Sequence, residues 1–161
     1  MPLSRLSSPK WMPPSGLTVL SIARTQDTGG WGWRLFAAFR RLAEGWTFRA
    51  AYRPNAFIYI QYPEDLTWMD AREWWKAADV VHLHNDFSTA KIMEQRGGTK
   101  PEVIQFHGTA FRADPTGVLD AMKRRGAIGI VSTLDLYLIA PDELEWVPSP
   151  YDIDWLQSLR P

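Results

Sequence analysis

The sequence contains no cysteine, which excludes disulfide bonds and zinc sites built on thiolates. It also lacks any apolar run approaching the roughly 20 residues needed to cross a bilayer. No charge of one sign dominates, because 18 basic residues balance 18 acidic ones. Such a surface has no broad field that would attract nucleic acid or an anionic membrane. We therefore expect a soluble, cytoplasmic protein with no nucleic-acid partner and no transmembrane segment.

The amino-terminal stretch, residues 1–16, carries four prolines among serines and lacks the continuous apolar core of a signal peptide. We expect it to be a flexible extension. Residues 17–154 are expected to form a single domain, since 161 residues is an ordinary length for one domain. Residues 155–161 are then a C-terminal tail.

Apolar, β-branched runs alternate with helical patterns along the chain. Residues 17–23 predict a buried strand, and further strands are expected at 48–52, 57–62, 80–84, 102–106, 127–131 and 144–147. Between them, helices are expected at 35–44, at 67–78, from a cap at Asp86 to Gly97-Gly98, and at 115–126. This alternation predicts an α/β fold: one Rossmann-like domain with a parallel sheet and helices on both faces. We expect residues 17–23 at or near the centre of the sheet, and a ligand site beyond the carboxyl ends of the strands.

A glycine-rich loop, Gly29-Gly30-Trp31-Gly32, separates the first expected strand from the first expected helix. Glycines at such a position let the backbone approach a phosphate, although a tight turn has the same requirement. The spacing is not that of a nicotinamide fingerprint, and the second strand ends in Arg53 instead of a ribose-binding acid. The loop therefore indicates a diphosphate site or a turn and disfavours a dehydrogenase.

All three histidines, His82, His84 and His107, fall near the carboxyl ends of two consecutive predicted strands. A three-histidine metal site is conceivable there, but His82 lies deeper in the sheet than His84 and no acid is placed to support a ligand. We expect no metal, and we expect His82 to be a hydrogen-bonded core residue.

Glu94 and Glu102 have the E-x7-E spacing known from retaining glycosyltransferases. Gly97-Gly98 lies between them, so the two carboxylates do not share one helix, and we reject the match. No Walker motif and no serine–histidine–acid grouping stands out.

Four segments, in this order, carry a resemblance to a known family. They are Thr28-Gly-Gly-Trp-Gly-Trp-Arg34, Ala78-Asp-Val-Val-His-Leu-His-Asn85, Val103-Ile-Gln-Phe-His-Gly-Thr109, and Ser132 to Pro141 followed by Trp146-Val-Pro-Ser-Pro-Tyr-Asp152. Together they resemble the N-terminal, acceptor-side domain of family-4-like glycosyltransferases, one half of a GT-B fold, over about residues 17–154.

The resemblance implies a retaining GT-B enzyme that needs no metal or other cofactor. The N-terminal domain of such enzymes holds the acceptor, and the C-terminal domain holds the nucleotide-sugar substrate. Carried over to this chain, His107 is the catalytic candidate beside the transferred sugar, Gly29 and Gly30 approach the donor diphosphate, and Arg112 assists an anionic group. The remaining donor- or acceptor-binding candidates are Trp31, Gly32, His84, Asn85, Gly108, Thr109 and Ser132.

The chain departs from this pattern at its end, because Pro161 follows shortly after the exit segment and no donor-binding half is present. Ser149 also replaces the asparagine often found between the exit prolines. We therefore expect a truncated glycosyltransferase-like domain that transfers a sugar to an unknown sugar or glycan acceptor. It would be incomplete without a donor-binding domain supplied by another chain or by a homo-oligomer. The alternatives are a non-enzymatic binding or structural module, and a stand-alone Rossmann-like enzyme of another kind.

Overall fold

The computed structural model describes residues 16–23, 45–52, 66–85 and 87–148. The glycine loop, the helix expected at 35–44, the strand expected at 57–62, and the segments 1–15 and 149–161 lie outside the described residues. Every statement below concerns the described part of the chain.

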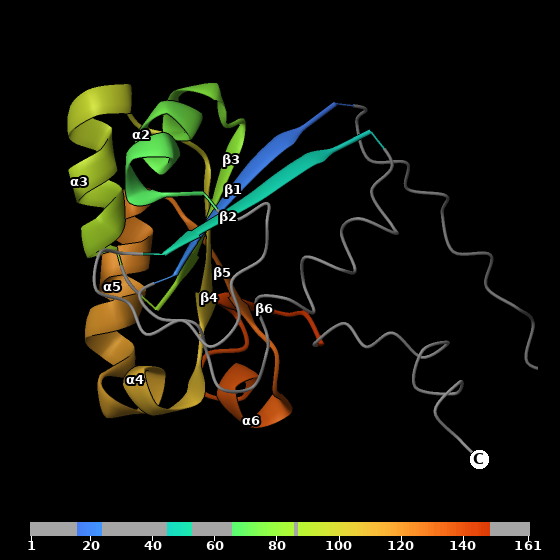
Figure 1. Cartoon of the computed structure of the whole chain (residues 1–161). Helices are drawn as coiled ribbons and strands as arrows, with labels where there is room; N and C mark the ends of the chain where they lie inside the picture. The colour runs from blue at the N-terminus through green and yellow to red at the C-terminus, as the bar shows by residue number, and fades with distance from the viewer. Residues whose placement is uncertain (1–15, 24–44, 53–65, 86, 149–161) are drawn as a thin grey trace, which may run out of the picture.

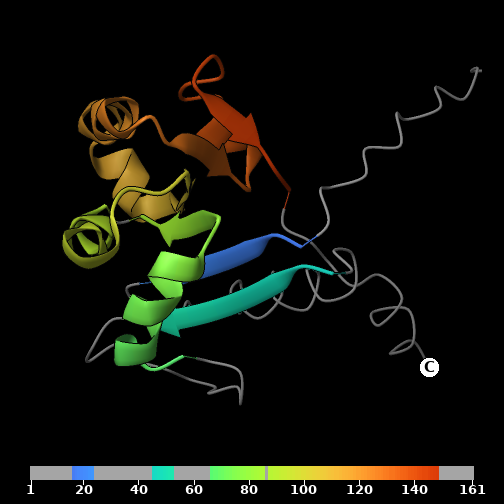
Figure 2. The same ribbon diagram turned by 90° about the horizontal axis from the view of Figure 1, so that it is seen from above.

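The centre of the fold is a six-stranded parallel sheet (Figures 1 and 2). Its strand order is β2-β1-β3-β4-β5-β6, and each neighbouring pair is parallel. The strands are β1 (Thr18–Ala23), β2 (Thr47–Tyr52), β3 (Val80–His84), β4 (Glu102–Phe106), β5 (Ile128–Val131) and β6 (Leu144–Trp146). The predicted α/β class and parallel sheet are confirmed.

The strand order places β1 near the centre of the sheet, directly beside β3 as expected, but not at the centre itself. β1 lies one strand in from the edge, and β3 and β4 occupy the centre. The reason is that only β2 forms a strand beyond β1 among the described residues, while four strands follow on the other side. Leu66 adds a single parallel bridge to Ala51 on the outer side of β2.

The described helices are α2 (Trp68–Ala77), α3 (Ser88–Gly97), α4 (Gly108–Ala113), α5 (Pro115–Arg125) and α6 (Leu134–Tyr137). The three longest, α2, α3 and α5, gather on one side of the sheet (Figures 1 and 2). They connect strands that all advance in the same direction across the sheet, and right-handed crossovers place such helices on one face.

Local signals fix the helix ends. The Thr67 hydroxyl accepts a hydrogen bond from the Asp70 backbone N–H at 3.1 Å, and Asp114 caps α5 by accepting from the Gly117 N–H at 3.0 Å. Gly126 ends α5 in the left-handed conformation, with φ of 65°. α3 begins at Ser88 with Phe87 at its N-cap position, and the expected cap Asp86 lies outside the described residues.

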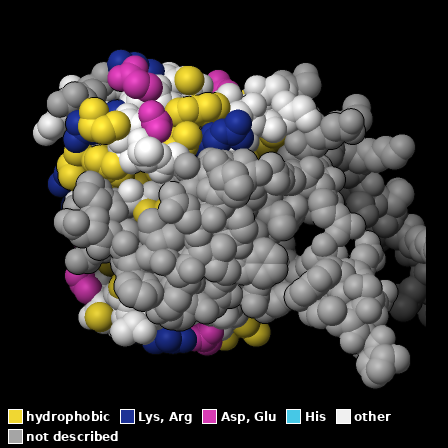
Figure 3. All heavy atoms as spheres, viewed as in Figure 1, with side chains coloured by type: hydrophobic (Ala, Val, Ile, Leu, Met, Phe, Trp, Pro, Cys, Tyr) yellow, Lys and Arg dark blue, Asp and Glu magenta, His cyan; other side chains and the backbone are white. Residues whose placement is uncertain are grey.

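The core between the sheet and these helices is apolar and fully buried around Trp75, Leu20, Leu83 and Ile104. Trp75 turns its single polar atom to a backbone partner: its indole Nε1–H donates to the Gly98 carbonyl at 2.9 Å. A buried tryptophan with a satisfied N–H gives apolar area without a desolvation cost. On the face shown in Figure 3, acidic and basic side chains are interspersed with hydrophobic ones, as the balanced composition predicts.

Candidate functional site

The topology has one switch point. The chain steps from β1 outward to β2, and every later described strand is added on the other side, so the direction reverses between β1 and β3. Loops diverge at such a point and leave a crevice at the carboxyl ends of the two strands, which is where open α/β sheets bind ligands. The side chains at this edge of β1, β3 and neighbouring β4 are therefore the first candidates.

Four polar side chains meet at this edge. Ser21 in β1 pairs in register with His82 in β3, and His84 follows two residues later on the same face. His107 directly follows β4 and occupies the N-cap position of α4. The register of three strands thus brings together residues that are far apart in the sequence.

The contacts among them form one continuous chain. Ser21 Oγ lies 3.3 Å from His82 Nδ1 and 3.2 Å from His84 Nε2. His84 Nδ1 lies 3.0 Å from His107 Nε2, with the two rings nearly parallel. Ser21 and His82 are buried, whereas His84 and His107 are half-buried. These contacts therefore run from the interior of the sheet toward its surface. We call the four residues the histidine chain: Ser21, His82, His84 and His107.

Asn85 fixes the backbone at the outer end of the histidine chain. Its φ of 53° is left-handed, a conformation that asparagine tolerates better than most residues. Its side-chain Oδ1 accepts from the His107 N–H at 2.7 Å, and its own N–H donates to the Gln105 carbonyl at 3.0 Å. Asn85 thus ties the end of β3 to the start of α4 and holds His107 in place.

Burial makes the inner histidines neutral at pH 7. The pKa of His82 is lowered to about 4, chiefly by burial and then by the nearby His107, while the buried Gln105 side chain acts in the opposite direction. The pKa of His84 is lowered well below its ordinary value by burial and then by His82 and His107. A neutral imidazole has one N–H donor and one acceptor nitrogen, so these rings can meet hydroxyl groups without carrying charge.

Arg112 does not join the histidine chain. Its guanidinium pairs with Asp135 of α6, and both side chains are exposed. The same guanidinium lies over Gly108, where a Cβ would collide with it. The pKa of Asp135 is lowered, first by a hydrogen bond from Thr133 and then by Arg112. Arg112 therefore forms an ion pair with an acidic side chain of the same protein and is not a member of the histidine chain.

The other predicted site residues fall into two groups. Thr109 is exposed on α4, and Ser132 follows Val131, which pairs in register with Phe106, the residue before His107. Gly108 and Thr109 thus follow His107 directly in the sequence, and Ser132 lies just beyond the end of β5, next to the end of β4. Gly29, Gly30, Trp31 and Gly32 lie outside the described residues, so their expected place beside His107 stays a prediction.

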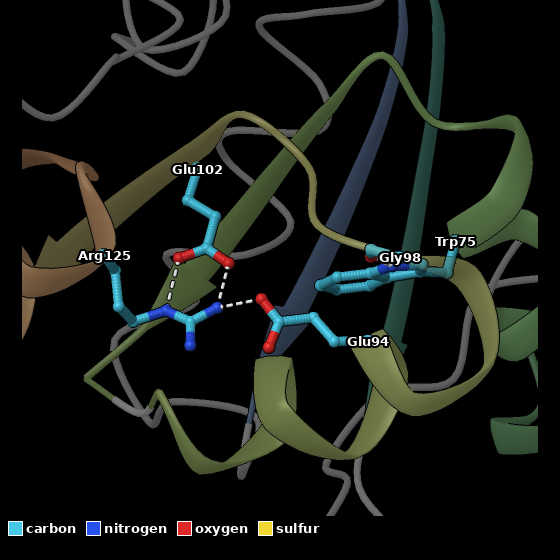
Figure 4. Close-up of polar contacts among 5 residues, drawn as sticks. All are labelled: Trp75, Glu94, Gly98, Glu102 and Arg125. Carbon is cyan, nitrogen blue, oxygen red and sulfur yellow. Dashed lines mark hydrogen bonds and ion pairs between the residues drawn. The ribbon is translucent and has the colours of Figure 1, made fainter.

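Glu94 and Glu102 do come together, but at the opposite edge of the sheet (Figure 4). Glu102 begins β4, Glu94 belongs to α3, and Arg125 at the end of α5 bonds both carboxylates, with its Nε donating to Glu102 Oε2 at 2.8 Å. These hydrogen bonds, the ones that Arg125 donates to Glu102 foremost, raise the pKa of Arg125. The two carboxylates share one guanidinium and lie on different elements, so the rejected E-x7-E match stays rejected.

Sequence reasoning missed Ser21 and Gln105. Both are buried polar residues inside strands; Ser21 contacts His82 and His84, and Gln105 raises the pKa of His82. The available signal was their position: a polar side chain in the middle of a buried parallel strand needs a hydrogen-bond partner. Identifying that partner requires the strand register, which local patterns do not provide. The expectation that His82 is a hydrogen-bonded core histidine is confirmed, since it is 5% exposed and contacts Ser21.

Two further findings concern the described residues only. They contain no group of three or more histidines, cysteines or acids placed to hold a metal ion. None of the helices they form is long and apolar enough to cross a membrane.

Comparison with known proteins gives a likeness of fold. No family model matches the chain, and no curated protein matches it. Among solved structures, the chain is similar to the glycosyltransferase SnogD from Streptomyces nogalater, with a TM-score of 0.43 and 16% sequence identity. The match covers 95% of this chain and 46% of SnogD, so the chain spans about half the length of that protein. We therefore build the functional proposal on this chain's own residues.

Proposed function

We propose that the chain is a glycosyltransferase-like domain that binds a sugar or glycan acceptor at the β1/β3 switch point. In this proposal His107 lies beside the transferred sugar, and a donor-binding domain on another chain or a second copy completes the enzyme. Residues 17–154 form the domain, and residues 1–16 and 155–161 are an extension and a tail. The observation that carries the proposal is the histidine chain, which ends in half-buried His107 at this edge of the sheet.

The chemistry of the histidine chain favours hydroxyl groups over charged ligands. His82 and His84 are neutral at pH 7, and the nearby cation Arg112 is paired with Asp135. A site of neutral donors and acceptors matches a sugar, whose hydroxyl groups both donate and accept hydrogen bonds. The diphosphate of a donor would need cations or backbone N–H groups, which we assign to the glycine loop at 29–32 and to the partner domain.

A non-enzymatic module is the second candidate, and one observation favours it. Ser21 and both ring nitrogens of His84 are engaged within the histidine chain itself. Polar groups satisfied internally can serve to fix the register of the sheet without binding anything.

A ligand screen on the full chain separates the two candidates. Nucleoside diphosphates, sugar nucleotides and simple sugars are tested for thermal stabilisation of the wild type, His107→Ala and Glu73→Gln. Glu73 forms an exposed pair with Lys76 on α2, so Glu73→Gln is a matched surface control. The proposal predicts that a sugar or sugar nucleotide stabilises the wild type and the control but not His107→Ala. Absence of stabilisation by every compound, with and without a donor-binding companion chain, supports the inert module.

A further inference from the structure

The histidine chain has a property that goes beyond binding a hydroxyl group. Resting on the proposed role of His107, we propose that Ser21 and His84 are positioning residues that force all three histidines into the same tautomer. They thereby set whether the outer nitrogen of His107 donates or accepts a hydrogen bond. The inference follows from counting donors and acceptors along the four side chains.

Ser21 connects two rings of the histidine chain, those of His82 and His84. Its hydroxyl has one proton to donate and lone pairs to accept with, and it is buried, so its proton needs an acceptor. In the described part of the chain, Ser21 Oγ lies within hydrogen-bond distance of two ring nitrogens, Nδ1 of His82 and Nε2 of His84. Ser21 therefore donates to one ring and accepts from the other, so these two nitrogens have opposite protonation.

His84 transmits the protonation state set at Ser21 to His107. A neutral imidazole carries its proton on one nitrogen only, so the state of His84 Nε2 fixes the state of His84 Nδ1. His84 Nδ1 lies 3.0 Å from His107 Nε2, and one of these two nitrogens must donate to the other. The choice made at Ser21 therefore reaches His107.

With all three rings neutral, only two arrangements satisfy these three contacts. In the first, Nδ1–H of His82 donates to Ser21, Ser21 donates to His84 Nε2, and Nδ1–H of His84 donates to His107 Nε2; all three rings are then protonated on Nδ1. In the second, every hydrogen bond is reversed and all three rings are protonated on Nε2. Nδ1 of His107 takes no part in these three contacts. It is a donor in the first arrangement and an acceptor in the second.

The protonation of His82, at the buried end of the histidine chain, is therefore coupled to that of His107 at the outer end. The Gln105 side chain is fully buried and raises the pKa of His82, and its amide, which makes no direct hydrogen bond in the described part of the protein, can present either a donor or an acceptor. In this way residues that touch no ligand act on the residue that does.

Nitrogen-15 NMR of the three histidine rings in the full chain at pH 7.5 tests the inference without any ligand. The chain has three histidines, so every ring signal belongs to this group. We expect the three rings to show the same tautomer population. Rings with clearly different tautomers would overturn the inference, whether or not the protein binds sugars. Equal tautomers in a protein that binds no sugar would support the inference and contradict the proposed function.

The matched variants are Ser21→Ala and Ser21→Thr. Removing the hydroxyl should uncouple His82 and change the tautomer population of His107, although Ser21 does not contact His107. Ser21→Thr keeps a hydroxyl and should restore the wild-type ring spectrum. A His107 spectrum identical in the wild type and in folded Ser21→Ala would show that Ser21 has only a structural role. If Ser21→Ala does not fold, the wild-type tautomers alone decide.

Discussion

Acidification from pH 7.5 to pH 5.0 should destabilise the protein through the buried histidines. The pKa of His82 is about 4 in the folded state and about 6.5 in the unfolded chain. Between these values the unfolded chain binds more protons than the folded protein, so stability is complete above about pH 6.5 and is lost as the pH falls toward 4. His84 acts in the same direction, because its pKa is also lowered by burial.

The magnitude follows from the width of the pH interval. Each tenfold difference in proton affinity corresponds to about 1.4 kcal/mol, so the interval from about 6.5 down to 5.0 costs about 2 kcal/mol for His82 alone. That is a large share of the roughly 5–15 kcal/mol that stabilises a typical domain. Carboxyl groups of model peptides titrate near pH 4, below this interval, whereas a model histidine titrates within it.

The assay is urea unfolding of the wild type, His82→Asn and Glu73→Gln at both pH values. Asparagine keeps a polar atom near the position of His82 Nδ1 but does not titrate. We expect the wild type and Glu73→Gln to lose at least about 2 kcal/mol at pH 5.0, and His82→Asn to lose about 2 kcal/mol less. Equal stability of the wild type at the two pH values, or an unchanged pH dependence in folded His82→Asn, would refute the reasoning.

Two further predictions concern stability away from the histidine chain. Arg125→Met leaves the carboxylates of Glu94 and Glu102 without their cation, and the Glu102 side chain is only 3% exposed, so urea unfolding at pH 7.5 should show a loss of about 3 kcal/mol that Glu102→Gln partly restores. A loss below about 1 kcal/mol would contradict the assigned role of Arg125. Thr67→Ala removes the cap of α2 and should cost about 1 kcal/mol, measured by the same assay. An unchanged midpoint would mean that Thr67 does not stabilise the helix start.

Much of the fold could be predicted because its signals are local. The strand at 80–84 agrees with β3 at both ends, and the caps at Thr67 and Asp114 come from short-range chemistry. The place of β1 in the strand order was not predictable in the same way, because strand order depends on contacts between distant segments. The N-cap position of α3 is Phe87, a residue type that gives no capping signal in the sequence.

The candidate site was predicted in part, because some of its residues stand out in the local sequence and others depend on contacts between distant segments. His84, Asn85 and His107 stand out in sequence because they follow apolar strands, and the structure brings them into contact. Ser21 and Gln105 were missed, since each is a single polar residue whose role depends on the register of β1, β3 and β4. Arg112 was assigned to an anionic group by resemblance, and its partner Asp135 could not be predicted locally because it lies 23 residues further along the chain.

The most direct test of the central claim is an NMR titration of the full chain with simple sugars and sugar nucleotides, observing the three histidine rings. If the switch point binds the acceptor through His107, the His107 signal should shift first and most, with smaller shifts at His84 and His82 along the chain of hydrogen bonds. His107→Ala should abolish the response, and Glu73→Gln should leave it intact. Binding that leaves all three ring signals unchanged would contradict the proposed site.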